Sequence, residues 1–273
     1  MHALGSNSVI EVGKILGYGE DAFTLWALKH RMSTILESLK DESTPSDCFA
    51  FYRPSFGRRG GQKNPEFGEF DAIIASTENI YLIEGKWDFL FPTKKEEIAV
   101  RKEQLLRHNI LSWYIARWDK KYLGNWDYFA EENKRNFEKE FNGKPIALSD
   151  SLLAVNLEFI LCFLQKHCRN FSCENNVKNV LLFFYNKKIN SPPSKVPKNF
   201  SLVEIDYSQV AIGNYINIEY SVNVSEKPLF QSFSRDKTHA KQKKTSFRCK
   251  TSITTMLAHT KDLKARLQQK KQE

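Results

Sequence analysis

Two acidic residues and a lysine stand at a spacing that could support metal-dependent hydrolysis: Asp71, Glu84 and Lys86. They flank two short apolar runs, residues 72–75 and 80–83, which are separated by a polar turn. If these runs pair as a β-hairpin, Asp71 lies directly opposite Glu84. Two facing carboxylates repel each other, and a divalent cation held between them would remove the repulsion.

The hairpin register also predicts which side chains share a face. The predicted cross-strand pairs are Ala75–Ile80, Ile73–Leu82, Asp71–Glu84 and Glu69–Lys86, all on one face. The other face carries Phe70, Ala72, Ile74, Tyr81 and Ile83. Both faces are therefore expected to be buried. The alternative is an ordinary hairpin with a solvated acidic end, where Glu69 and Lys86 form a weak surface ion pair.

The elements around this hairpin predict an α/β fold with a mixed β-sheet and helices on both faces. Expected helices cover residues 20–39, 94–118, 126–141 and 151–166, and expected strands cover residues 48–52, 180–185, 202–207 and 215–222. Residues 1–224 are expected to form one domain with a helical insertion around 120–170.

The positive charge of the chain is concentrated at its C-terminal end. Residues 226–273 hold 13 Lys and Arg against 4 Asp and Glu, whereas the remainder is balanced; the whole chain of 273 residues carries a net charge of +9. A basic tail at 225–273 on a neutral body suggests a polyanionic partner, with nucleic acid the first candidate. The equally weighted alternative is a solvated, partly disordered end.

Asp71 and the run Glu84-Gly85-Lys86 fit the pattern Asp-x(n)-Glu-x-Lys. This pattern closely resembles the signature of the PD-(D/E)xK nuclease superfamily, which has the restriction-endonuclease-like fold. The resemblance covers roughly residues 17–118 and implies an αβββαβ core. Phe70 stands where that family often has Pro.

The resemblance implies a Mg²⁺- or Mn²⁺-dependent endonuclease in which Asp71, Glu84 and Lys86 are catalytic. Independently of the family, carboxylates suit a hard cation and a lysine suits the developing negative charge of phosphodiester hydrolysis. The expected metal ligands are Asp71, Glu84, the carbonyl of Gly85, and Glu20 from the preceding helix.

The expected nucleic-acid contacts lie on either side of the hairpin. Arg53, Arg58, Arg59 and Lys63 belong to a basic, Gly-rich stretch before it, and Arg101 and Gln104 belong to the helix after it. The basic stretch is equally compatible with a solvent-exposed loop without a ligand. His108 shares a helical face with Gln104, and we expect it merely to line the helix surface.

DNA is the expected substrate, in a restriction, repair or mobile-element role, with RNA as an alternative. The sequence leaves open whether the protein forms a homodimer or binds a partner protein. The alternative function is a catalytically silent nucleic-acid-binding or assembly protein on the same fold.

No apolar run approaches the roughly 20 residues of a membrane span, and no signal peptide is visible. Five cysteines without a paired framework favour a reducing, cytoplasmic location.

Overall fold

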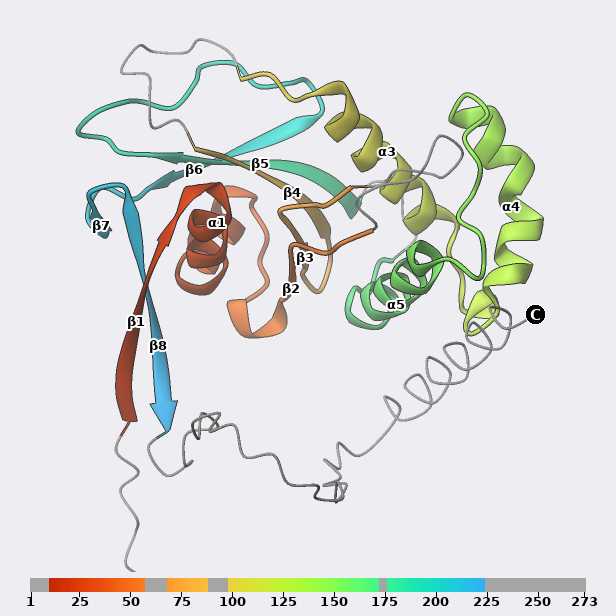
Figure 1. Cartoon of the computed structure of the whole chain (residues 1–273), viewed down its shortest axis with the longest axis horizontal. Coiled ribbons are helices and arrows are strands. Elements are labelled where there is room, and N and C mark those ends of the chain that lie inside the picture. The colour runs from red at the N-terminus through yellow and green to blue at the C-terminus, as the bar shows by residue number, and fades with distance from the viewer. Residues whose placement is uncertain (1–9, 57–67, 88–97, 172–175, 224–273) are drawn as a thin grey trace, which may run out of the picture. The chain divides into compact units, whose positions relative to one another are not determined.

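The computed structural model describes residues 10–56, 68–87, 98–171 and 176–223 (Figure 1). The chain divides into a larger unit, Leu16–Ile218, and a smaller one that joins Met1–Ile15 to Glu219–Glu273. The candidate functional residues within the described ranges all belong to the larger unit. Arg58, Arg59, Lys63 and the basic tail lie outside the described residues.

A five-stranded mixed sheet forms the centre of the larger unit. Its strand order is β2-β3-β4-β5-β6, with antiparallel pairing from β2 to β4 and parallel pairing from β4 to β6. The strands are β2 Phe49–Tyr52, β3 Ala72–Ala75, β4 Ile80–Trp87, β5 Val177–Tyr185 and β6 Phe200–Asp206. The expected mixed sheet is confirmed.

Helices cover both faces of this sheet. They are α1 Gly19–His30, α2 Met32–Ser38, α3 Lys102–Arg117, α4 Trp126–Glu140 and α5 Leu152–His167, with short 3₁₀ turns at Pro45–Asp47 and Lys120–Tyr122. One buried cluster joins α1 and α2 to the sheet, and another joins α3, α4 and α5 to its opposite face. Figure 1 shows the second group of helices gathered away from α1.

The predicted hairpin register is confirmed where β3 and β4 pair. Ala75 lies opposite Ile80, and Ile73 lies opposite Leu82. The side chains of β3 are all buried, as are those of β4 up to Gly85. A strand buried on both faces reads as a continuous apolar run, which explains the composition of these two segments.

The register does not continue to the residues before β3, and two expectations fail for that reason. The chain bends at Asp71, so Phe70 packs in the cluster of Ile73 and Leu82 instead of on the opposite face. Glu69 forms its bridge with Ser55 and is not paired with Lys86. Strand alternation predicts a face only within the strand itself.

A buried carboxylate holds the hairpin turn. Asp41, which follows α2, accepts hydrogen bonds from Ser76 Oγ at 2.7 Å, Asn79 Nδ2 at 2.9 Å and Tyr81 Oη at 2.5 Å. The backbone N–H of Ser43 donates a fourth at 2.9 Å. These bonds stabilise the turn from outside the hairpin and thereby help to fix the register at its closed end.

Two helices differ from the expected ranges. The helix expected over residues 20–39 is interrupted at Arg31, where φ is −129°. Within α1, Leu25 is exposed while Trp26 and Ala27 are buried. The helix expected from residue 94 begins at Lys102 in the described part of the chain, and residues 94–97 lie outside it.

A second, three-stranded sheet has the order β1-β8-β7, with β1 Ile10–Tyr18, β7 Ala211–Ile212 and β8 Tyr215–Asn223. In the smaller unit, Lys14 and Glu219 form an exposed ion pair at 3.9 Å. None of the helices in the described ranges combines the length and the hydropathy needed to cross a membrane.

Candidate active site

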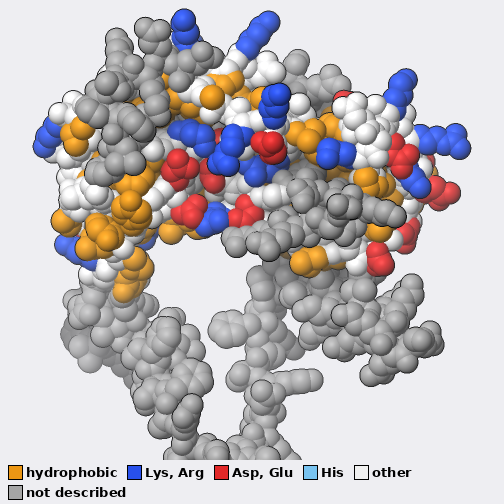
Figure 2. Space-filling view, turned by 45° about the horizontal axis from the view of Figure 1, so that its top comes forward, with side chains coloured by type: hydrophobic (Ala, Val, Ile, Leu, Met, Phe, Trp, Pro, Cys, Tyr) orange, Lys and Arg blue, Asp and Glu red, His pale blue; other side chains and the backbone are white. Residues whose placement is uncertain are grey.

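A cavity of about 300 Å³ lies where β3 begins and β4 ends. Its lining mixes carboxylates, cations and an amide: Glu20, Gly68, Glu69, Asp71, Glu84, Lys86, Arg101, Gln104 and Arg107. The structure thus brings together predicted site residues from α1, the hairpin and the start of α3. Figure 2 shows Lys, Arg, Asp and Glu side chains intermixed across the middle of one face of the molecule.

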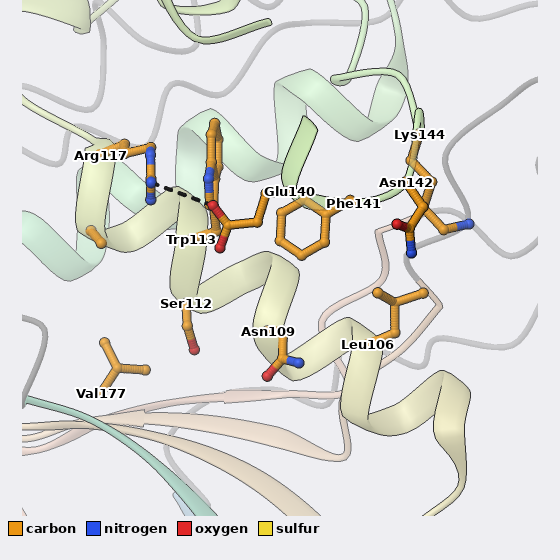
Figure 3. Close-up of a pocket in the computed structure, with 11 residues that line it drawn as sticks. Leu106, Asn109, Ser112, Trp113, Arg117, Glu140, Phe141, Asn142, Lys144 and Val177 are labelled. Carbon is orange, nitrogen blue, oxygen red and sulfur yellow. Dashed lines mark ion pairs between the residues drawn. The ribbon is translucent and has the colours of Figure 1, made fainter. Parts of the chain in front are cut away.

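A larger cavity of about 530 Å³ lies between α3 and the C-terminal end of α4 (Figure 3). Its single acidic lining residue, Glu140, forms an ion pair with Arg117 at 3.6 Å. One paired carboxylate offers little to a metal ion. The candidate active site is therefore the smaller cavity, where several carboxylates meet.

Asp71 is joined to the neighbouring strand through its side chain. The backbone N–H of Gly85 donates to Asp71 Oδ2 at 2.7 Å. A Cβ at position 85 would lie 3.4 Å from that oxygen and 2.8 Å from Thr24 Oγ1. The absence of a side chain at Gly85 therefore lets α1 and the Asp71 carboxylate approach β4 closely.

Asp71 is hard to ionise in this position. Burial of the carboxyl and the negative charge of Glu84 raise its pKa to about 6, although the hydrogen bond from Gly85 and the charge of Lys86 oppose the shift. A pair of carboxylates in which one has a raised pKa is electrostatically unsatisfied, and added positive charge would relieve it.

Glu84 is surrounded by donors. Its side chain is 3 % exposed, Lys86 Nζ lies 3.1 Å from Oε1, and Arg107 Nη2 lies 3.1 Å from Oε2. Gln104 Nε2 also donates to Oε1. Burial alone would raise the pKa of Glu84, but the imidazole of His108 and the charges of Lys86 and Arg107 outweigh it and hold the pKa below its ordinary value.

Lys86 is held by its own strand. Its ammonium donates to the carbonyl of Gly85 at 2.9 Å as well as to Glu84. The side chain is 19 % exposed, so it borders the cavity while it remains largely desolvated. The Gly85 carbonyl, expected as a metal ligand, is here an acceptor for Lys86.

Glu20 and the start of α3 complete the lining. Glu20 lies in the first turn of α1, and its Oε1 accepts a hydrogen bond from the backbone N–H of Trp87 at 3.3 Å. Gln104 accepts from the backbone N–H of Arg101 at 3.0 Å while its amide nitrogen donates to Glu84. Gln104 thus connects the beginning of α3 to Glu84, and its expected contact with nucleic acid stays a prediction.

Sequence analysis missed Arg107 and underestimated His108. Arg107 stands one turn after Gln104, and that spacing could have placed it on the same helix face. His108 is fully buried: Nε2 lies 3.9 Å from Glu84 Oε2, and Nδ1 lies 2.8 Å from Asn179 Oδ1. The expectation that His108 merely lines the helix surface is wrong.

Arg53 is engaged by carboxylates. Its guanidinium forms ion pairs with Asp21 and, at 2.7 Å, with Glu69, and its backbone N–H donates to the carbonyl of Asp71 at 3.1 Å. Its φ of +46° is unusual for a non-glycine residue. These contacts connect α1 with the segment before β3, and the expected phosphate contact of Arg53 stays a prediction.

The carboxylates of Asp71, Glu84 and Glu20 line one cavity, and carboxylate oxygens are the ligands that hard divalent cations prefer. Within residues 10–56, 68–87, 98–171 and 176–223, however, no group of three or more His, Cys, Asp or Glu side chains is arranged to hold a metal. Glu84 would have to exchange some of its present donors for the ion.

Comparison with known proteins adds no relative. No protein-family model, no curated protein and no solved structure matches this chain. Its function must therefore be inferred from the chemistry of this cavity.

Proposed function

We propose that this chain is a metal-dependent nuclease that hydrolyses phosphodiester bonds in DNA, with Asp71, Glu84 and Lys86 as its catalytic residues. One observation carries the proposal: the two carboxylates and the lysine line a single cavity in which Asp71 is left with a raised pKa. Added positive charge between Asp71 and Glu84 would relieve their repulsion, and a divalent cation is the species that carboxylates with this arrangement favour.

The fold is compatible with this proposal. With α2, α4 and α5 treated as additions, the elements α1, β2, β3, β4, α3 and β5 give the order αβββαβ that the resemblance to the PD-(D/E)xK superfamily implies. Asp71 lies just ahead of β3, and the Glu-x-Lys run lies at the end of β4, the strand paired with β3. We therefore propose a restriction-endonuclease-like core.

Asp71, Glu84 and Glu20 would hold Mg²⁺ or Mn²⁺. Such an ion supplies positive charge for the phosphate and lowers the pKa of a bound water. Lys86 would orient the attacking water and offset negative charge on the phosphate oxygens. Gln104 and Arg107, which contact Glu84, would keep the carboxylate correctly oriented.

Cleavage assays with and without metal test the proposal. We expect DNA cleavage by the full chain in Mg²⁺ or Mn²⁺ and none in EDTA. Asp71→Asn and Lys86→Ala should each reduce the rate about 10²- to 10⁴-fold. Asp127→Asn and Lys134→Ala are matched controls, because these exposed residues of α4 lie outside the cavity lining. Cleavage that survives both cavity variants would reject the site, and parallel digestion of RNA would decide the substrate.

A specific observation supports a second candidate, a nucleic-acid-binding or assembly protein that does not cut. Three donors already contact Glu84, which leaves less of that carboxylate for a metal ion. This candidate predicts DNA binding in EDTA, with an affinity that falls steeply with salt, and no cleavage in any divalent metal.

A further inference from the structure

Three aromatic rings contact one another in a row: Tyr18, Trp87 and Tyr215. The rings of Tyr18 and Trp87 meet edge to face at a centroid distance of 5.4 Å, and Tyr18 lies 5.6 Å from Tyr215. Tyr18 is 59 % exposed and Tyr215 is 48 % exposed. We call these three residues the aromatic row.

The row stands on a rigid base. The Trp87 ring stacks on Phe23 at 4.9 Å with an interplanar angle of 26°, and its Nε1 donates to Tyr207 Oη at 3.0 Å. Phe23 is fully buried in the cluster beneath the sheet. Trp87 is therefore fixed by the core, and it in turn supports one side of the exposed Tyr18 ring.

The row is connected to the candidate active site through Glu20, which lines the cavity. The Trp87 ring lies on the α1 face of β4, opposite the side chain of Lys86, and the Trp87 backbone N–H donates to Glu20 Oε1 at 3.3 Å. Tyr18 immediately precedes α1, whose second residue is Glu20. Tyr18 is therefore two residues from a side chain that lines the cavity.

We propose that the aromatic row stacks on unpaired nucleobases, and hence that the protein acts on single-stranded nucleic acid or on single-stranded segments of a duplex. Exposed aromatic rings bind bases by stacking without regard to sequence, and neighbouring cations bind the phosphates. Lys86 and the exposed Arg101, both in the cavity lining, are placed to supply that charge. In a duplex the bases already stack on one another and offer no free face to Tyr18.

This inference rests on the proposed function, because it assumes that the phosphate backbone of a nucleic acid lies in the cavity. Stacking of bases on the aromatic row, however, requires no cleavage. It can therefore be tested in EDTA, where the proposed chemistry is silent. The probes are a fluorescently labelled oligothymidine, the same strand with abasic sites in place of bases, and the same strand in a duplex. The abasic strand keeps its phosphates and lacks the stacking partner.

We expect the full chain to bind the normal strand more tightly than the abasic strand or the duplex. Tyr18→Ala and Tyr215→Ala should each weaken binding of the normal strand roughly 5- to 100-fold and leave binding of the abasic strand nearly unchanged. Tyr18→Phe should retain the affinity because the ring is kept. Tyr128→Ala, which removes an exposed tyrosine of α4, is the control.

Failure to bind any of the probes would overturn the inference, and so would equal losses on the normal and abasic strands. Equal affinity for strand and duplex would also overturn it, because binding would then depend on the phosphates alone. Loss of cleavage in Asp71→Asn with unchanged, Tyr18-dependent binding would support both proposals. The same Tyr18-dependent binding without cleavage under any condition would support base stacking on the aromatic row and reject the proposed nuclease activity.

Discussion

The carboxylate of Asp71 and the backbone N–H of Gly85 are joined by a 2.7 Å hydrogen bond. This bond connects the residue just ahead of β3 to the end of β4, beyond the point where the two strands pair. It sets the position of Asp71 relative to the Glu84–Lys86 segment. The chemistry of the cavity thus depends on how closely Asp71 and α1 can approach β4.

Gly85→Ala should lower the free energy of unfolding by about 1–3 kcal/mol. The added Cβ would lie 2.8 Å from Thr24 Oγ1, which is too close for either residue to remain in place. Urea denaturation measures the cost. In a Thr24→Ala background the obstructing oxygen is gone, so the same substitution should cost less; an equal cost in both backgrounds would contradict this explanation.

Asp71→Asn should stabilise the metal-free protein above neutral pH. Because the folded-state pKa of Asp71 is raised from 3.8 to about 6, the folded protein binds the proton more tightly than the unfolded chain. The resulting stability is fully present below pH 3.8 and is lost as the pH rises through about 6. Asparagine keeps an acceptor for Gly85 and carries no charge.

Denaturation of wild type and Asp71→Asn in EDTA, at about pH 5 and about pH 7.5, measures this effect. The variant should gain up to about 3 kcal/mol relative to wild type at the higher pH and roughly half as much at the lower. Asp127→Asn, in an exposed carboxylate of α4, should show no such pH-dependent gain. A gain that is the same at both pH values would mean that packing, and not ionisation, is responsible.

Arg107→Met should destabilise the protein at neutral pH by up to about 3 kcal/mol, because it leaves the buried Glu84 with fewer cations. The pKa of Glu84 should rise, so that the penalty shrinks as the pH falls and Glu84 becomes protonated. Thermal or urea melts across pH would show both effects. Adding Glu84→Gln to Arg107→Met should recover part of the loss.

Arg117→Met is the matched control for that prediction. Its partner Glu140 is 53 % exposed, whereas Glu84 is 3 % exposed. An exposed ion pair contributes about 1 kcal/mol or less. If both arginine variants lowered the free energy of unfolding equally, the explanation by desolvation of Glu84 would be wrong.

Asp41→Ala should cost about 2–4 kcal/mol at neutral pH, since it removes several hydrogen bonds to one buried charge. Burial works against ionisation of Asp41, but the hydrogen bonds from Ser76, Tyr81 and Ser43 prevail and hold its pKa well below the usual range. The contribution is therefore present above pH 3.8 and is lost as the pH falls through the lowered folded-state value.

Asp47→Ala provides the comparison for Asp41, because Asp47 is an exposed carboxylate bonded only locally to Thr44 in the described structure. Its effect should be a small fraction of that of Asp41→Ala. Denaturation at neutral and acidic pH would test both variants. Equal losses would show that the turn does not depend on the buried network.

The hairpin was predictable because its signal is local. Continuous apolar runs on either side of a polar turn leave few possible registers, and the pairs Ala75–Ile80 and Ile73–Leu82 are as predicted. The same rule failed at Phe70, where the chain bends before β3 and periodicity no longer applies. Sequence pattern therefore located the carboxylates but not the path of the chain just ahead of them.

The surroundings of the carboxylates were less predictable because they depend on tertiary packing. The contacts of Glu84 with Gln104, Arg107 and His108 require the exact phase of α3 against the sheet. Asp41 reaches the hairpin turn from the end of α2, and no local pattern encodes that distance. The interruption at Arg31 likewise carries no strong breaker residue in the sequence.

The parallel pairing of β4 with β5 has a consequence for the order of folding. Ile80 pairs with Ala75 nearby in the chain, but also with Val177, after α3, α4 and α5 have intervened. Hairpins close within microseconds, whereas distant pairings must first overcome a large loop-closure entropy. The hairpin that carries Glu84 and Lys86 should thus form early, and the parallel half of the sheet should dock onto it in the slow phase of refolding.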